Sequence, residues 1–136
     1  MNVAPAQAAR PTNPASYAAS KCGSGYSLIH SYNKTDSQGI IWSKSYVFWN
    51  GSSKKNCAIV LKWFEWGYNS DTYIDLSSYN SNGTRYQRDW DSGDYAYYAG
   101  PVYLYAPGRC VDILSFVDAN SGGARYTYDS PMVGCG

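Results

Sequence analysis

The chain has 136 residues, which is room for a single domain, and its formal net charge is +1. No basic stripe is available to neutralise phosphates, which argues against a nucleic acid partner. No apolar run approaches the roughly 20 residues that a membrane span needs. Tyrosine is the unusual residue, because 15 tyrosines and five tryptophans favour pleated, half-buried β-surfaces.

The N-terminal stretch has the composition of the end of an export signal followed by a linker. Residues 6–8 (Ala-Gln-Ala) fit the A-x-A rule for signal-peptidase cleavage, although no charged or apolar region precedes them. We interpret residues 1–8 as a signal-peptide remnant, with an ordinary Ala/Pro-rich tail as the alternative. Residues 10–20 are rich in Ala, Ser and Pro and are expected to be a disordered linker. Residues 1–21 would thus precede a single domain over residues 22–136.

Short β-type runs separated by Gly, Asn, Ser and Asp follow one another along the rest of the chain, without helical periodicity. In chain order, strands are expected at residues 26–32, 40–49, 57–66, 73–79, 85–90, 95–105, 110–117 and 125–128. The third run is apolar on both faces and is expected at the centre of a sheet, whereas the polar fifth run is expected at an edge. The pattern predicts an all-β domain, a small disulfide-stapled β-sandwich or β-barrel of seven or eight antiparallel strands.

Four widely spaced cysteines indicate disulfide bonds. They contain no C-x-x-C pair and the chain has one histidine, which argues against a zinc site. An even count together with an export signal favours oxidised pairs. Of the three possible pairings, we expect Cys57–Cys110, because each residue opens an apolar strand, and Cys22–Cys135, which would tie the ends of the domain together.

One stretch carries a family resemblance. Residues 98–106 (Tyr-Ala-Gly-Pro-Val-Tyr-Leu-Tyr-Ala), followed by Gly108 and by residues 110–112 (Cys-Val-Asp), resemble the signature of the spore-associated protein A family. Residues 22–26 resemble the start of the mature domain in that family, and residues 56–60 resemble its second-cysteine strand. The terminal Cys-Gly also fits.

This resemblance spans residues 22–136, with all four cysteines in the family's order. It implies export and association with the cell or spore surface of a sporulating actinobacterium. It implies no enzymatic activity, ligand or catalytic residue. The present chain departs from the family by its many aromatic residues between Trp42 and Trp90.

An aromatic cluster is the best candidate for ligand binding. Exposed faces of Trp and Tyr stack on sugar rings, and nearby Asn69, Asp71 and Asp75 would bond the sugar hydroxyls. If they are buried, the same side chains are simply core. The candidate ligand-binding residues are Trp63, Trp66, Tyr68, Tyr73, Trp90 and Tyr95.

Catalytic and metal-binding patterns are weak. His30 is the only histidine and lies in an alternating strand, and the chain has no G-x-S-x-G turn. Glu65 is the only glutamate and is expected on the surface at a strand end. Residues 89–94 (Asp-Trp-Asp-Ser-Gly-Asp) are oxygen-rich like a calcium loop, but they lack its bidentate glutamate and are expected to form a turn with solvated acids. We expect no catalytic residue, no metal and no cofactor.

These observations predict a secreted, non-enzymatic surface or spore-associated structural protein with Tyr-rich sheet faces. Its expected partners are cell-wall or spore-surface components, including glycans, and copies of itself. A carbohydrate-binding module that uses exposed Trp and Tyr is the alternative. An exported inhibitor or toxin is a third hypothesis, because small disulfide-bonded β-scaffolds often serve so.

Overall fold

The computed structural model describes residues 9–135, so the predicted signal-peptide remnant at residues 1–8 lies outside the described residues. Within that range a short helix precedes eight strands, and each strand overlaps one of the predicted runs. The elements are α1 (Pro14–Cys22), β1 (Ser27–Thr35), β2 (Ile41–Asn50), β3 (Lys55–Lys62), β4 (Ser70–Tyr79), β5 (Arg85–Tyr95), β6 (Tyr98–Tyr105), β7 (Val111–Asp118) and β8 (Arg125–Asp129).

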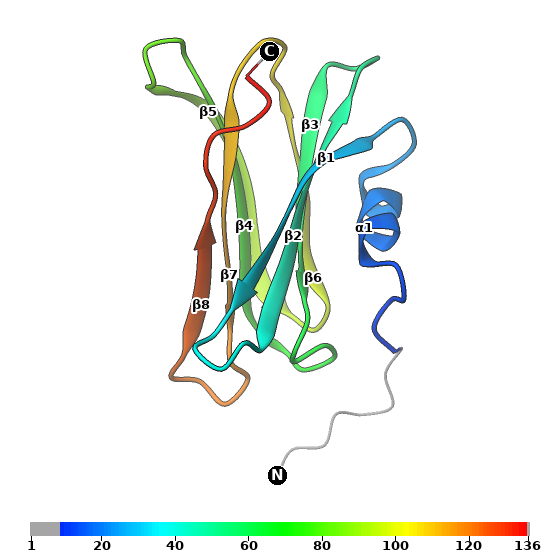
Figure 1. Ribbon diagram of the computed structural model, residues 1–136, viewed down its shortest axis with the longest axis vertical. Coiled ribbons are helices and arrows are strands. Elements are labelled where there is room, and N and C mark those ends of the chain that lie inside the picture. Colours follow the sequence, from blue (N-terminus) through cyan, green and yellow to red (C-terminus); the bar gives the residue numbers. More distant parts are fainter. Residues whose placement is uncertain (1–8, 136) are drawn as a thin grey trace.

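The strands form two antiparallel sheets packed face to face (Figure 1). Sheet A has the order β1-β2-β3-β6 and sheet B the order β5-β4-β7-β8, which confirms the predicted sandwich and leaves no closed barrel. The expected central strand is β3, between β2 and β6, and the expected polar edge strand is β5. The third strand ends at Lys62 rather than at Trp66, because residues 63–69 form a loop closed by turn hydrogen bonds such as Trp66 N–H to the Trp63 carbonyl.

The main core lies between the two sheets and follows from the two-residue alternation of each strand. Ala58 and Val60 of β3 meet Ile74 and Leu76 of β4 and Ile113 of β7, and all five are fully buried. Burying a side chain such as Val, Leu or Ile contributes about 1.5 to 3 kcal/mol. This core therefore accounts for the pairing of the sheets.

A second core lies on the outer side of sheet A, where α1 covers the sheet (Figure 1). Phe48 of β2 and Ile59 of β3 point to this side and pack against Ala18 of α1, which is fully buried. The Asn13 side chain caps the helix by accepting the Ser16 N–H at 3.1 Å, and Pro14 occupies the first turn.

The prediction of a disordered linker at residues 10–20 is therefore wrong for the residues that α1 occupies. Composition alone suggested disorder, but the apolar outer face of β3 needs a cover and the small residues of this segment let the helix approach closely. No helix in the described part of the chain is long and apolar enough to span a membrane.

The expected disulfide pairing is also wrong, because the structure pairs Cys22 with Cys57 and Cys110 with Cys135. Cys57 alternates with Ala58 and so faces α1 rather than sheet B, which places it beside Cys22 at the end of the helix. Cys110 precedes β7 in the other sheet. The C-terminal segment returns along β7 through a Val111–Val133 bridge, which brings Cys135 to Cys110.

Candidate functional site

The structure does not bring the six predicted aromatic residues into one site. Trp63, Trp66 and Tyr68 lie in the loop between β3 and β4, and the rings of Trp63 and Trp66 pack on the side of sheet A and α1. Tyr73 and Trp90 point outward from sheet B. Tyr95 lies at the end of β5, where its hydroxyl donates to Asp91 at 2.7 Å. Their role as ligand-binding residues stays a prediction, and two separate faces of the molecule now have to be considered.

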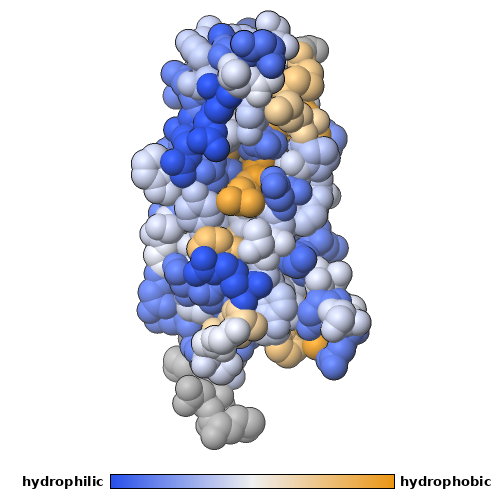
Figure 2. All heavy atoms as spheres, turned by 90° about the vertical axis from the view of Figure 1, so that its left-hand side faces the viewer, coloured by the Kyte–Doolittle hydropathy of each residue, from blue (hydrophilic) through white to orange (hydrophobic). Residues whose placement is uncertain are grey.

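The outward side chains of sheet B, which we call the sheet B face, form an uncovered surface. They alternate along each strand with residues buried in the main core. Figure 2 shows this side of the molecule as mostly hydrophilic, with small separate apolar patches. The sheet B face consists of Asp71, Tyr73, Asp75, Ser77, Tyr79, Arg85, Arg88, Trp90, Ser92, Asp94, Asp112, Leu114, Phe116, Asp118, Arg125, Thr127 and Asp129.

An aromatic and charged network fixes the middle of the sheet B face. The Tyr73 ring stacks on Phe116 with centroids 5.1 Å apart, and its hydroxyl donates to Asp75 at 2.8 Å. Arg88 donates from Nε to the same carboxylate at 2.8 Å and lies over the Trp90 ring at 4.5 Å. Asp75 is 6% exposed whereas Trp90 is 53% exposed. The Trp90 side chain is thus exposed to solvent next to a fixed set of hydrogen-bonded and ion-paired groups.

Carboxylates dominate the rest of the sheet B face. Arg125 pairs with Asp118 at 2.7 Å and with Asp71 at 3.3 Å. Asp112 accepts the Tyr79 hydroxyl at 2.9 Å, and burial raises the pKa of the Asp112 carboxyl above its usual value. Six carboxylates stand against three guanidinium groups on this face, which gives it a formal net charge of −3.

The predicted calcium-like segment forms neither a calcium loop nor a turn, because residues 89–94 run inside strand β5. Asp89 and Asp91 occupy inward positions of this edge strand. Their carboxylates accept the backbone N–H groups of Tyr103 at 3.0 Å and of Gly100 at 2.8 Å, both in β6. The two acids therefore close the gap between the sheet edges. In residues 9–135 no three metal-binding side chains gather into a cluster.

Cations and aromatic rings share the opposite side of the molecule, which we call the sheet A face. The Trp63 ring lies between Lys44 at 4.9 Å and Arg10 at 5.5 Å, and Lys21 of α1 lies 4.9 Å from the Tyr17 ring. The Trp66 ring packs edge-on against Tyr17. The cations of the sheet A face are Arg10, Lys21, Lys44 and Lys55.

A buried lysine joins three segments at one end of the sandwich. Lys62 is 1% exposed, and its Nζ donates to Ser70 Oγ at 2.5 Å, to the Tyr95 carbonyl at 3.0 Å and to the Tyr68 carbonyl. Burial lowers the pKa of Lys62 to about 8. Sequence reasoning missed its role, although its alternation with Ala58 and Val60 places it on the inward side of β3.

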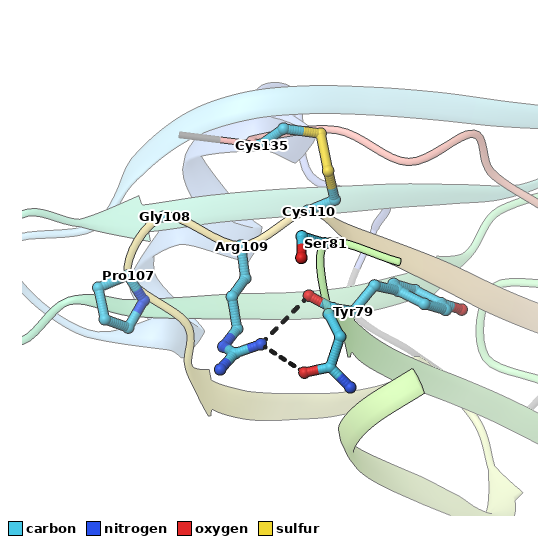
Figure 3. A pocket seen from close by; sticks show the side chains of 8 residues that line it. Tyr79, Ser81, Pro107, Gly108, Arg109, Cys110 and Cys135 are labelled. Carbon is cyan, nitrogen blue, oxygen red and sulfur yellow. Dashed lines mark hydrogen bonds between the residues drawn. A yellow bond between two sulfur atoms is a disulfide. The ribbon is translucent and has the colours of Figure 1, made fainter. Parts of the chain in front are cut away.

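A polar cavity of about 460 Å³ opens beside the Cys110–Cys135 disulfide (Figure 3). Arg109 donates from Nη1 to the Asn80 side chain at 3.0 Å and to the Tyr79 carbonyl at 3.4 Å. None of the predicted binding residues lies there.

The two side chains considered for catalysis, His30 and Glu65, each contact other groups of the fold. His30 is exposed on β1, where its ring stacks with Tyr32. Glu65 accepts the backbone N–H of Asn120 at 2.7 Å and so connects two loops. Glu65 therefore holds the β7–β8 turn to the loop after β3.

The fold and these faces together define a class: a two-sheet β-sandwich with two disulfides, one helix-covered face and one open face. The chain is 33% identical over 91 residues to spore-associated protein A of Streptomyces coelicolor. The match covers 67% of this chain and 53% of that protein, so the chain spans about half the length of the curated relative it matches. This comparison confirms the family resemblance: the chain belongs to the family of spore-associated protein A.

Two further comparisons found nothing. No protein-family model matches the chain, and no solved structure matches it.

Proposed function

We propose that this chain is an exported protein of the spore or cell surface that acts by binding through its sheet faces rather than by catalysis. The similarity to a protein named for its association with spores carries the proposal. Two disulfides support it, because such bonds persist in oxidising compartments outside the cytoplasm. Its partners are wall or spore-surface components, and the aromatic and charged faces of the sandwich are the surfaces available to them.

Fractionation of the producing organism tests this location. We expect the protein in washed spores and in hyphal wall fragments, detected by an antibody, with a cytoplasmic enzyme followed as the control for lysis. Recovery only from the free medium contradicts surface attachment. Recovery only with the cytoplasmic control contradicts export.

A glycan is the second candidate partner, and the geometry around Trp90 favours it. Sugar rings stack on exposed indoles, and carbohydrate hydroxyls bond to fixed polar groups such as the Arg88 guanidinium, which buried Asp75 holds beside Trp90. The inward-facing acids Asp89 and Asp91 take no part, because they bond to β6.

Pull-down on insoluble chitin, cellulose and peptidoglycan tests the glycan candidate. We expect Trp90→Ala to abolish retention on the glycan that retains the wild type. Tyr105→Ala is the matched control, because Tyr105 is 58% exposed but belongs to sheet A. Equal losses in both variants, or no retention of the wild type on any of the three, contradict glycan binding at Trp90.

A further inference from the structure

Charged side chains are sorted between the two outer sides of the sandwich. All 11 basic and 10 acidic residues of the chain lie within the described range. None of the ion pairs that the structure shows among residues 9–135 involves a cation of the sheet A face, although Lys55 lies near Asp89 at the border with β5. Three of the four cations of this face hold their positions against aromatic rings: Lys44 and Arg10 on Trp63, and Lys21 on Tyr17. This side therefore carries a fixed positive surface.

The opposite side is negative. On the sheet B face, Arg88 and Arg125 are occupied by ion pairs with carboxylates of the same face. Asp94 of β5 and Asp129 of β8 are exposed at its two edges. The excess of carboxylates is thus spread across the full width of the sheet rather than gathered in one site.

The two sides face away from each other, with α1 and sheet A on one side and sheet B on the other (Figure 1). We propose that the sheet A face of one copy docks on the sheet B face of a second copy of this chain. Opposite potentials of this kind attract and orient two molecules. Because the two surfaces differ, each added copy leaves one face of each kind free, and association continues into a chain of copies instead of stopping at a closed dimer.

Apolar side chains are present on both surfaces to support such a contact. Trp90 is 53% and Leu114 37% exposed on the sheet B face, while Leu28 is 44% and Tyr105 58% exposed on the outer side of sheet A. Apolar and aromatic residues within a charged surround are typical of protein interfaces. A second copy of this chain offers the complementary charge together with the same mixture of apolar and charged side chains. This inference does not depend on where the protein is located.

Two charge-reversed variants test the proposal with purified full chain. In the first, Lys21→Glu and Lys55→Glu reverse two cations of the sheet A face. In the second, Asp94→Lys and Asp129→Lys reverse two exposed acids of the sheet B face. Lys34→Glu is the control, since Lys34 pairs with Ser43 and so points to the other side of sheet A from Lys44. Circular dichroism checks that every variant is folded.

Sedimentation velocity gives the measurement. At 0.1 M salt we expect the sedimentation coefficient of the wild type and of the Lys34→Glu control to rise with concentration. Each double variant should remain monomeric, and an equimolar mixture of the two should associate again, because each then offers what the other lacks. At 1 M salt the wild type should also be monomeric, since the screening length falls from about 10 Å to about 3 Å.

Three results would overturn the proposal. They are a wild type that stays monomeric at 0.1 M salt and millimolar concentration, double variants that associate like the wild type, and a mixture that does not restore association. A fourth result would also overturn it: the wild type is monomeric and binds polyphosphate, and the variant with Lys21→Glu and Lys55→Glu does not bind it. The partner of the sheet A face would then be an anionic polymer and not a second copy of this chain.

Discussion

The outer sides of the two sheets differ in how far they are shielded from water. On sheet A, Phe48 is 1% exposed and Cys57 fully buried, because α1 covers them. On sheet B, no helix of the described chain covers the outward residues, and Trp90 is 53% exposed. An antiparallel sheet needs only one buried face. The alternating Asp, Ser and Thr residues of β4, β7 and β8 let sheet B remain open, whereas β3 is apolar on both faces and, with Tyr46 and Phe48 of β2, needs a cover.

This difference separates a tightly packed side from an open side within one small fold. The covered side stabilises the domain through packing and a disulfide. On the open side, side chains such as Trp90 stay exposed to solvent. The predictions below test that division, from the largest expected effect to the smallest.

Removal of the Cys22–Cys57 disulfide should have the largest effect on stability. The bond closes a loop with a sequence separation of 35 residues, for which the chain-entropy relation gives about 4 kcal/mol. The variant Cys22→Ala with Cys57→Ala should lose at least that much and release α1, as seen by faster hydrogen exchange in residues 14–22. The pair Cys110→Ala with Cys135→Ala is the control and should leave exchange in α1 unchanged. Protected α1 amides in the first variant would show that packing alone holds the helix.

Two phenylalanines on opposite faces offer a direct comparison. Phe48→Ala should lower the free energy of unfolding by about 4 kcal/mol, because it leaves a cavity under α1. Phe116→Ala should cost about 1 kcal/mol, since it removes a stacked pair and a cation–π contact from a partly exposed position. Urea denaturation measures both. Equal costs would mean that the sheet B face is as tightly packed as the covered one.

Buried Lys62 should make the free energy of unfolding depend on pH in the alkaline range. Between pH 8 and 10.5 the folded protein has lost the Lys62 proton that the unfolded chain still holds, so stability should rise with pH, by up to about 3 kcal/mol. Burial raises the pKa of Tyr46 to about 12, so above pH 10 the unfolded chain ionises first and stability should fall again.

Urea denaturation at a series of pH values between 7 and 11 measures this profile. Lys62→Met is the control and should lose the rise while it keeps the fall. A rise that survives in Lys62→Met would assign the effect to another group.

Trp90→Ala should have the smallest effect on stability, below about 1 kcal/mol, because the side chain is more than half exposed. Thermal unfolding by circular dichroism measures it. A loss above about 2 kcal/mol would break the comparison, since Trp90 would then be a structural residue and not a group available to a partner.

The positions of the strands along the chain, and which residues share a face of each strand, could be predicted from the sequence. Two-residue alternation is a local property, and it correctly gave the eight strands, the central position of β3 and the edge position of β5. The even number of cysteines correctly predicted oxidised pairs. The run of residues 98–106 correctly indicated the family.

Only the tertiary structure decided which of these elements meet. Alternation says that Cys57 and Ile59 share a face, but not that α1 lies on it, because a short helix of small residues has the composition of a linker. Nor does it say that the chain leaves sheet A after β3 and returns to it with β6. That crossover separates Trp63 from Trp90 and turns Asp91 toward β6, while the position of α1 and the return of the C-terminal segment along β7 set the disulfide pairing. All of these depend on contacts between residues far apart in the sequence.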